Sequence, residues 1–393
     1  MSGITGLGTT YNLPNYTGIL YDLTPANTPM FSAIGGLGNG GQVTSTEIEW
    51  QTEDLGNASQ DVALEGADAP TAEARARANV TNVVQIQQKQ VSVSYTKLAA
   101  VGLKAGTNNE EMNPVRSELD RQTSNALKSM VRNIEYSFIN GVYQKPSDNS
   151  TARKTRGLLA AISTNLTARA TSTITGLSAA TDTVTETSTG LSNGDQIIFT
   201  DVGASTTLVV GRVYYVVSKA TNTFKVAATS GGSAITIGTA TVAYRVPWTT
   251  TLTTGHVSTL LQSVFDNGGI EDQGTATLMV NSSQKLAISA AYASDYGKFM
   301  ETSRTVGGVA VDTIVTDFGV LNVMLSRFVP QDTIIVASLE QCQPVYLEIP
   351  GKGHFFAEPL AKTGASDKVQ LYGEVGLAYG NEKAHGAITG LNV

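Results

Sequence analysis

The first forty residues combine closely spaced prolines with many apolar side chains. Pro14, Pro25 and Pro29 bias the residues before them towards extended backbone and remove helix hydrogen bonds, so no helix is expected here. Disordered tails are poor in apolar residues, so this arm must pack on its own domain or on another copy. That requirement is typical of an assembly protein rather than of an enzyme. The apolar residues are Leu13, Tyr16, Ile19, Leu20, Tyr21, Leu23, Met30 and Phe31.

The arm ends in a glycine-rich run at 35–41 (GGLGNGG), which contains the pattern G-x-G-x-x-G. A dinucleotide site needs this pattern after a strand and at the start of a helix, where the phosphate meets the helix N-terminus. Here the run follows the proline-rich arm and precedes an expected strand at 43–50. We therefore expect a flexible joint rather than a phosphate site.

A second glycine pattern, G-x-S-x-G at residues 190–194, is typical of a nucleophile elbow. An elbow requires a helix directly after the serine, with Asp and His later in the chain. Residues 195–199 (DQIIF) indicate a strand instead. We therefore predict a hairpin turn at Asn193 and Gly194.

Acidic residues are concentrated at the start of the chain. Residues 1–74 contain nine Asp or Glu and no Lys or Arg, whereas the whole 393-residue chain has a net charge of −7. Only 15% of the residues are charged, against roughly 25% in ordinary domains. A low charge content is expected when partners cover much of the surface, and it is also expected of a Thr-rich β protein. Two interpretations stay open: a solvated acidic loop, or an acidic segment lying on basic residues within 75–156 of a neighbouring copy.

Few residues suit catalysis or metal binding. The one cysteine, Cys342, excludes an internal disulfide and a cysteine-based zinc site, and we expect it to be buried. His256, His354 and His385 have no second metal-type ligand at helical spacing, and the last two are expected in loops. No signal peptide and no apolar run of the ~18 residues that a membrane helix needs is found, so we expect a soluble protein made in a cytoplasm. We predict no enzyme activity, no cofactor, and no catalytic or metal site.

Two strands joined by a projecting loop are predicted for residues 43–95. Thr46, Ile48 and Trp50 share one face of the first strand, and the residues after it are polar and acidic. In the second strand, apolar positions 80, 84 and 86 and positions 91, 93 and 95 follow opposite phases. This slip predicts a bulge or a break near residues 87–90.

A long helix is predicted for residues 114–140. Asn113 is a good N-cap, Pro114 suits the first helical position, and Gly141 ends the helix. Apolar residues recur every three or four positions along one stripe. At 1.5 Å per residue the helix is about 40 Å long. A single apolar stripe on so long a helix predicts that it lies across a sheet.

Residues 165–247 differ in composition from the rest, with Thr, Ser, Ala, Gly and Val dominant. Short strands and turns without helix signals predict an inserted all-β domain, either a sandwich or a small barrel. Mixed structure returns after residue 248. The predicted strands are 182–187, 195–201, 212–218, 223–228 and 239–245 in this segment and 276–280, 309–315, 320–325, 333–337 and 369–379 after it; the predicted later helices are 257–266 and 281–292.

Short motifs lie near both ends of the chain: 12–16 (NLPNY), 24–25 (TP), 27–29 (NTP), 34–36 (IGG), 316–319 (TDFG), 327–330 (RFVP), 362–364 (KTG), 372–374 (YGE) and 381–386 (NEKAHG). Together they resemble the major capsid (head) proteins of tailed double-stranded DNA bacteriophages. The resemblance covers most of the chain outside 165–247. Within that segment, 190–195 (GLSNGD), 214–217 (YYVV) and 222–224 (NTF) resemble small β-modules of phage structural proteins.

The resemblance implies an α+β protein with the Hong-Kong-97-type capsid fold, which encapsulins share. An outward-facing position is expected for the inserted domain. The implied parts are an N-terminal arm (1–40), an extended loop hairpin (41–100), a peripheral domain with a spine helix at 114–140 (101–164 and 346–393), an inserted Ig-like sandwich or small barrel (165–247) and an axial domain (248–345).

The implied function is self-assembly through pentamers and hexamers into an icosahedral shell that encloses double-stranded DNA. The protein would be part of the virion and assemble in the host cytoplasm, with no membrane and no sequence-specific DNA contact. Separate scaffolding, portal and decoration proteins are the expected partners, and no Lys–Asn crosslinking pair is marked. An encapsulin-like compartment around cargo enzymes and a phage tail or adhesin component remain the alternatives.

Contacts between subunits are expected on the arm, on the acidic loop and on the basic helix. Removing residues 1–34 is expected to leave a folded subunit that does not form stable shells. The expected contact residues are Leu13, Pro14, Tyr16, Pro25, Pro29, Phe31, Glu47, Glu49, Glu53, Asp54, Arg116, Arg121, Lys128 and Arg132.

Overall fold

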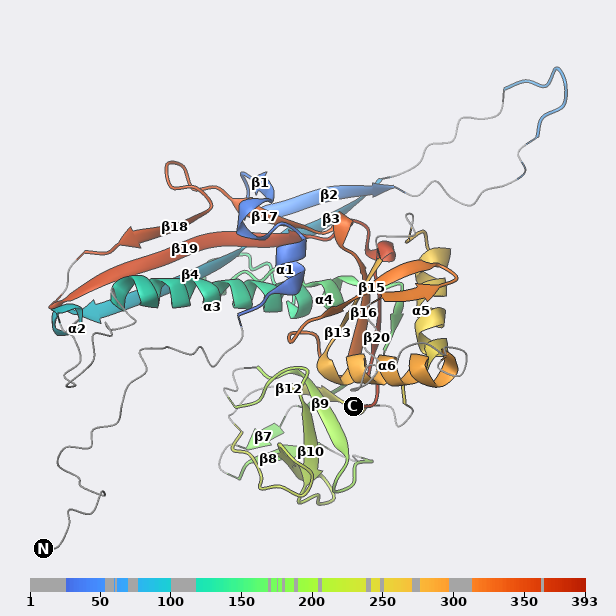
Figure 1. The fold of residues 1–393 in the computed structure, drawn as a ribbon. Coiled ribbons are helices and arrows are strands. Elements are labelled where there is room, and N and C mark those ends of the chain that lie inside the picture. The colour runs from blue at the N-terminus through green and yellow to red at the C-terminus, as the bar shows by residue number, and fades with distance from the viewer. Residues whose placement is uncertain are drawn as a thin grey trace, which may run out of the picture.

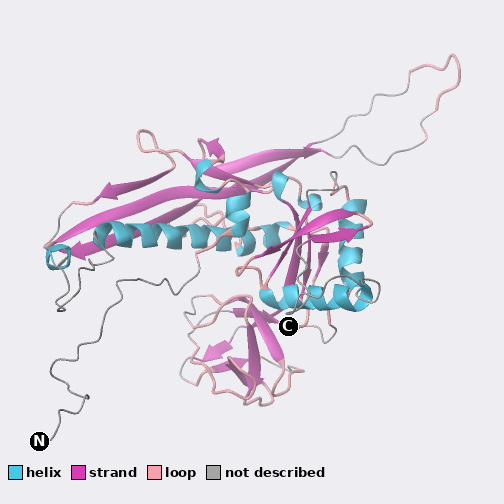
Figure 2. Ribbon diagram, viewed as in Figure 1, coloured by secondary structure: helices cyan, strands magenta, loops and turns pink. Residues whose placement is uncertain are grey.

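The computed structural model shows a long layer of strands and helix, a second sheet at one end of it, and a third sheet beside both (Figure 1). Figure 2 shows that helices gather on the first two sheets, whereas the third consists of strands and loops in its described part. The structure describes residues 26–53, 60, 62–69, 77–99, 118–168, 171–174, 176–178, 181–186, 190–203, 207–237, 242–247, 251–270, 276–296, 313–361 and 364–393.

The strand β19 (Ser366–Ala378) is the centre of the long layer and confirms the long strand predicted near the C-terminus. Along one side it pairs antiparallel with β4 (Gln85–Ser94) over ten residues. Along the other side it pairs with β18 (Phe355–Pro359) and then with β17 (Gln343–Leu347). The sheet is completed by β1 (Gly41–Val43), which runs parallel to β17.

The helix α3 (Glu118–Asn140) lies along β4 and β19 (Figure 1). Its residues Met130, Ile134 and Phe138 are spaced four apart and are buried, as the apolar stripe predicts. The helix ends at Gly141, where a Cβ atom would lie only 2.5 Å from the carbonyl oxygen of Thr155. The prediction of a helix across a sheet is confirmed, while its expected first residues, 114–117, lie outside the described part.

The strands β2 (Glu47–Glu53) and β3 (Arg77–Val83) form an antiparallel hairpin, which confirms the two predicted strands. The expected bulge or break at 87–90 is wrong in its position, because β4 keeps a regular register with β19 through these residues and the break lies at Val84. Polar side chains explain the error. Gln85 and Lys89 occupy inward positions of β4, where they bond to Ser137 and Ser129 of α3, so the apolar pattern is interrupted without a change of face.

The second sheet has six strands and packs against two helices. The helices α5 (Thr254–Asp266) and α6 (Ser282–Tyr296) cover it, with Leu261 and Ile288 in the shared core. The predicted strands 276–280, 320–325 and 333–337 are confirmed, and of 309–315 the structure describes only the end. In order across the sheet the strands are β14 (Thr313–Thr316), β15 (Gly319–Leu325), β13 (Ala276–Val280), β16 (Thr333–Ser338), β20 (Gly386–Thr389) and β5 (Leu166–Thr167).

The third sheet, called the seven-stranded sheet below, has its own core. Phe199 meets Tyr214 edge-on at 5.5 Å, and Phe224 meets Tyr244 at 5.8 Å. The five strands predicted between 182 and 245 are present. In order the strands are β6 (Thr171–Ile174), β12 (Val242–Arg245), β9 (Gln196–Asp201), β10 (Val213–Val217), β11 (Thr223–Ala227), β8 (Thr183–Thr185) and β7 (Gly176–Ser178).

The turn at Asn193 and Gly194 is present, with Gly194 at a φ of 95° that favours glycine. It is not the predicted hairpin, because the strands on either side of it do not pair with each other. β8 pairs with β11 and β7, whereas β9 pairs with β10 and β12.

The end of the arm is more ordered than the sequence predicts. The expectation of no helix is wrong, since Pro29 begins the short helix α1 (Pro29–Ala33), where its missing N–H costs nothing. The glycine run forms the 3-10 turn η1 (Gly36–Gly38). Tyr346 Oη donates to the Gly36 carbonyl oxygen at 2.6 Å, and a Cβ atom at Gly40 would clash with the Tyr346 ring. These contacts hold the run against β17 instead of leaving the expected flexible joint.

Cys342 is 4% exposed within the main core, which confirms its predicted burial. Burial raises the pKa of its thiol to about 12. His385 lies in the expected loop but is fully buried. Its Nδ1 accepts the Ser338 N–H at 3.2 Å and its Nε2 donates to the Tyr379 carbonyl oxygen at 2.8 Å. Both ring nitrogens are thus used by a neutral, structural imidazole.

Candidate assembly surfaces

A buried carboxylate holds the point where the arm meets the subunit. Glu135 of α3 accepts the N–H of Met30 at Oε1 (3.1 Å) and the N–H of Phe31 at Oε2 (2.6 Å). The first N–H groups of a helix lack partners within the helix, and a carboxylate there also interacts favourably with the helix dipole. Burial raises the pKa of Glu135. The carboxylate therefore ties α1, near the C-terminal end of the arm, to α3.

Two of the expected contact residues, Pro29 and Phe31, belong to α1. Phe31 is 2% exposed and packs edge-on against Phe138, with ring centroids 5.8 Å apart. The ring therefore has almost no surface left for another subunit. The other expected contacts on the arm, Leu13, Pro14, Tyr16 and Pro25, lie outside the described residues.

The acidic residues at the base of the hairpin have partners within their own subunit. The Lys145 Nζ lies 2.6 Å from Glu47, the Arg77 Nε lies 3.5 Å from Glu53, and Asn79 donates to Glu49 at 3.1 Å. Exposed pairs of this kind contribute little to stability. A neighbouring subunit would have to compete with these contacts. Asp54 lies outside the described residues.

Two apolar residues in the segment that connects β2 to β3 are highly exposed. Val62 is 76% exposed and Leu64 is 86% exposed, next to the acidic residues Glu65 and Asp68. Covering large aliphatic side chains with another surface removes them from water and lowers the free energy. Sequence reasoning missed both residues, although two aliphatic side chains within an acidic stretch were the signal that could have found them.

The basic face of α3 is partly neutralised within the subunit. Arg121 Nη2 lies 2.8 Å from Glu118 Oε1, and hydrogen bonds from Arg121 and Gln122 lower the pKa of Glu118 to about 2. Lys128 is exposed. The Arg132 guanidinium lies 5.9 Å from the centre of the Phe328 ring. Arg116 lies outside the described residues. Of the expected basic contacts on α3, Lys128 and Arg132 are therefore the two that the structure does not pair with Glu118.

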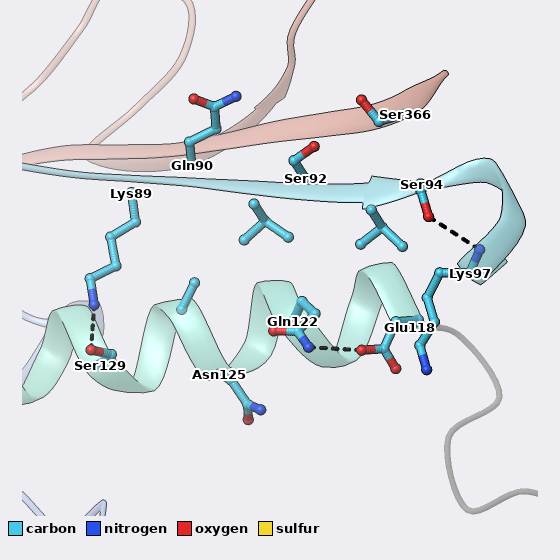
Figure 3. Close-up of a pocket in the computed structure, with 13 residues that line it drawn as sticks. Lys89, Gln90, Ser92, Ser94, Lys97, Glu118, Gln122, Asn125, Ser129 and Ser366 are labelled. Atoms are coloured by element: carbon cyan, nitrogen blue, oxygen red, sulfur yellow. Dashed lines mark hydrogen bonds between the residues drawn. The ribbon is translucent and has the colours of Figure 1, made fainter. Parts of the chain in front are cut away.

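A groove of about 790 Å³ lies between β4 and the first turns of α3 (Figure 3). Its walls carry hydroxyl and amide groups, and its ends carry Lys89, Lys97 and Glu118. Figure 3 shows Lys89 bonded to Ser129 and Gln122 bonded to Glu118, so these polar groups satisfy one another.

Another exposed apolar pair lies at the edge of the six-stranded sheet. Val315 of β14 and Val320 of β15 face each other across the strands and are 78% and 40% exposed.

Within the described part of the chain, no group of three or more His, Cys, Asp and Glu side chains is placed to hold a metal ion. No helix among the described residues is long and apolar enough to span a membrane.

Comparison with known proteins identifies the family of this chain. The family model of the SU10 major capsid protein matches residues 3–392. A search among curated proteins finds no match. Among solved structures the chain is similar to a subunit of the cyanophage A-1(L) capsid, with a TM-score of 0.54 and 13% identity over 99% of each chain.

Two further structures share the fold. The capsid of cyanophage P-SCSP1u has a TM-score of 0.50 and 10% identity, covering 97% of this chain and 94% of that one. The capsid of a native GTA particle has a TM-score of 0.50 and 10% identity, covering 98% of this chain and 97% of that one. Identities this low establish the fold alone, which is the Hong-Kong-97 type of phage capsids. With the family match over nearly the whole length, the chain belongs to the SU10 major capsid protein family, and it is a structural component of a bacteriophage virion and not an enzyme.

Proposed function

We propose that many copies of this chain assemble through pentamers and hexamers into an icosahedral shell that encloses a double-stranded DNA genome. The observation that carries this proposal is the family match over residues 3–392. Rings of pentamers and hexamers use heterologous interfaces that close on themselves. An acidic chain suits a shell that confines DNA without binding it tightly, since tight binding needs clustered basic residues.

The parts of the subunit take different roles in this proposal. Residues 1–40 act as the arm, and residues 41–100 act as the extended loop, with β1 and β4 joining it to the sheet of the long layer. Residues 101–164 and 346–393 act as the peripheral domain and 248–345 as the axial domain, with β20 of the C-terminal part pairing with the axial strand β16. Residues 165–247 form an inserted β domain on the outer face, where it does not meet the packaged DNA. The seven-stranded sheet has a hydrophobic core of its own, which supports its assignment as an inserted domain.

Contacts between subunits involve the arm and the hairpin. Residues 1–25, including Leu13, Pro14, Tyr16 and Pro25, lie on a neighbouring subunit, while α1 stays on its own. The segment between β2 and β3 places Val62 and Leu64 on the neighbour, close to its basic residues. Assembly takes place in the host cytoplasm with a separate scaffolding protein, a portal and decoration proteins as partners.

The content of purified particles tests the proposal. Particles formed with this chain are treated with nuclease and protease, opened, and assayed for DNA and for enclosed protein. We expect double-stranded DNA that resisted the nuclease. Closed particles that hold a cargo enzyme and no genome would contradict the proposal and favour an encapsulin-like compartment.

A further inference from the structure

The seven-stranded sheet is fixed to the rest of the subunit where the chain enters it. Just before β6, the strand β5 pairs with β20 of the six-stranded sheet. The preceding residue, Asn165, is 2% exposed, and its Nδ2 donates to the carbonyl oxygens of Lys383 (2.7 Å) and His385 (3.1 Å). Its Oδ1 accepts from Ser263 Oγ at 2.9 Å. The incoming chain is therefore held by a satisfied buried amide.

A buried ion pair holds the chain where it leaves the sheet. Arg245, the last residue of β12, forms a two-pronged contact with Asp332 through Nε and Nη2, the latter 2.7 Å from Oδ1. Nη2 also donates to Thr333 Oγ1 at 3.0 Å. The Arg245 side chain is 10% exposed and the Asp332 side chain 0%. This pairing of planar groups fixes both distance and orientation.

A loop of the sheet makes a third attachment to the same region. The Gln331 N–H donates to the Gly211 carbonyl oxygen at 2.9 Å, and the Val213 N–H donates to Gln331 Oε1 at 3.2 Å. Gly211 has a φ of 76°, and a Cβ atom there would lie 2.8 Å from Pro330. The loop thus fits closely onto residues 330–331, directly before Asp332.

Asp332 also holds the C-terminal residues. Its Oδ2 accepts the Gly390 N–H at 3.1 Å, and its carbonyl oxygen accepts the Leu391 N–H at 2.9 Å. The Leu391 side chain is fully buried. One residue therefore receives hydrogen bonds from the last strand of the seven-stranded sheet and from the end of the chain.

We propose that Asp332 is a latch that couples the seven-stranded sheet to the C-terminal residues 390–393. A buried carboxylate is costly unless all of its partners are in place, so the loss of Arg245 loosens the contacts that the same carboxylate makes with Gly390. Coupling of this kind is reciprocal, so loosening the C-terminal residues also loosens Arg245.

The latch makes the seven-stranded sheet a rigid part of the subunit and not a tethered module. Any movement of β16 or of the C-terminal residues during assembly is transmitted to it. This inference rests on contacts within one subunit, so it stands or falls independently of what the shell encloses.

Hydrogen–deuterium exchange of the full-length protein tests the latch. Arg245→Met removes the charge at similar length, and Arg245→Lys keeps the charge but loses the planar pairing. In the Met variant we expect exchange in a peptide covering 386–393 to accelerate at least tenfold relative to peptides of β19, with a smaller acceleration in the Lys variant. Lys219→Met, in the turn between β10 and β11 of the same sheet, is the control and leaves this peptide unchanged.

The reverse direction uses the other end of the latch. Leu391→Ala is expected to accelerate exchange in β12, whereas Leu377→Ala, equally buried in β19, changes β12 no more than it changes the other strands of the seven-stranded sheet. If Arg245→Met does not fold, the Lys variant and Leu391→Ala carry the test. Unchanged exchange at 386–393 in a folded Arg245 variant, or at β12 in Leu391→Ala, would overturn the proposal.

Discussion

Val62 and Leu64 give the sharpest mutational prediction for assembly. The double substitution Val62→Ser and Leu64→Ser removes two aliphatic side chains that are 76% and 86% exposed in the subunit. Because they contact so little of their own chain, we expect the free energy of unfolding to change by less than about 0.5 kcal/mol. If a neighbouring subunit covers both, their burial contributes about 3 kcal/mol to each contact. At 1.4 kcal/mol per factor of ten, the variant associates about 100-fold more weakly per contact.

The assay compares folding with assembly in the same preparations. Chemical denaturation measures the free energy of unfolding, and sedimentation velocity over a range of concentrations measures the assembled fraction. Val209→Ser is the control, since Val209 is an aliphatic side chain that is 50% exposed in the loop between β9 and β10 of the seven-stranded sheet, which we place on the outer face. Assembly of the double variant at the wild-type concentration would refute a docking role for the hairpin.

Three further predictions follow from the arm and the core. Deleting residues 1–25 leaves the unfolding midpoint nearly unchanged but abolishes stable shells in electron micrographs; the longer deletion 1–34 also removes buried core residues of α1 and should destabilise the subunit itself. Phe31→Ala costs about 3–5 kcal/mol of unfolding free energy, measured by denaturant titration, because the Phe138 ring loses its partner. Burial lowers the pKa of His385 from its ordinary 6.5, so the unfolded chain takes up a proton first and stability falls as the pH drops below about 6.5; in His385→Gln this part of the pH dependence of unfolding should disappear.

The sequence predicts elements well where one face of an element is apolar throughout. The helix α3 and the strands β13, β16 and β19 have such faces, and their predicted positions agree with the structure to within a few residues. The prediction failed at β4, because Gln85 and Lys89 are inward residues whose polar groups bond to α3. The helix α1 was missed because its N-terminal partner, Glu135, is more than one hundred residues away in sequence.

The candidate surfaces were only partly accessible from sequence. The acidic stretch is visible in the composition, but the partners of Glu47 and Glu53 within the subunit depend on how the hairpin folds. Phe31 was assigned to an interface because an apolar arm needs a surface, and the structure supplies that surface from its own α3. Side-chain exposure identified Val62 and Leu64, and exposure is a property of the folded chain.

Cryo-electron microscopy of purified particles tests the central claim most directly. We predict closed icosahedral shells of pentamers and hexamers in which the segment between β2 and β3 of each subunit, with Val62 and Leu64, lies on a neighbouring subunit. Fibres or open rings, or closed shells in which this segment contacts no neighbour, would contradict the account.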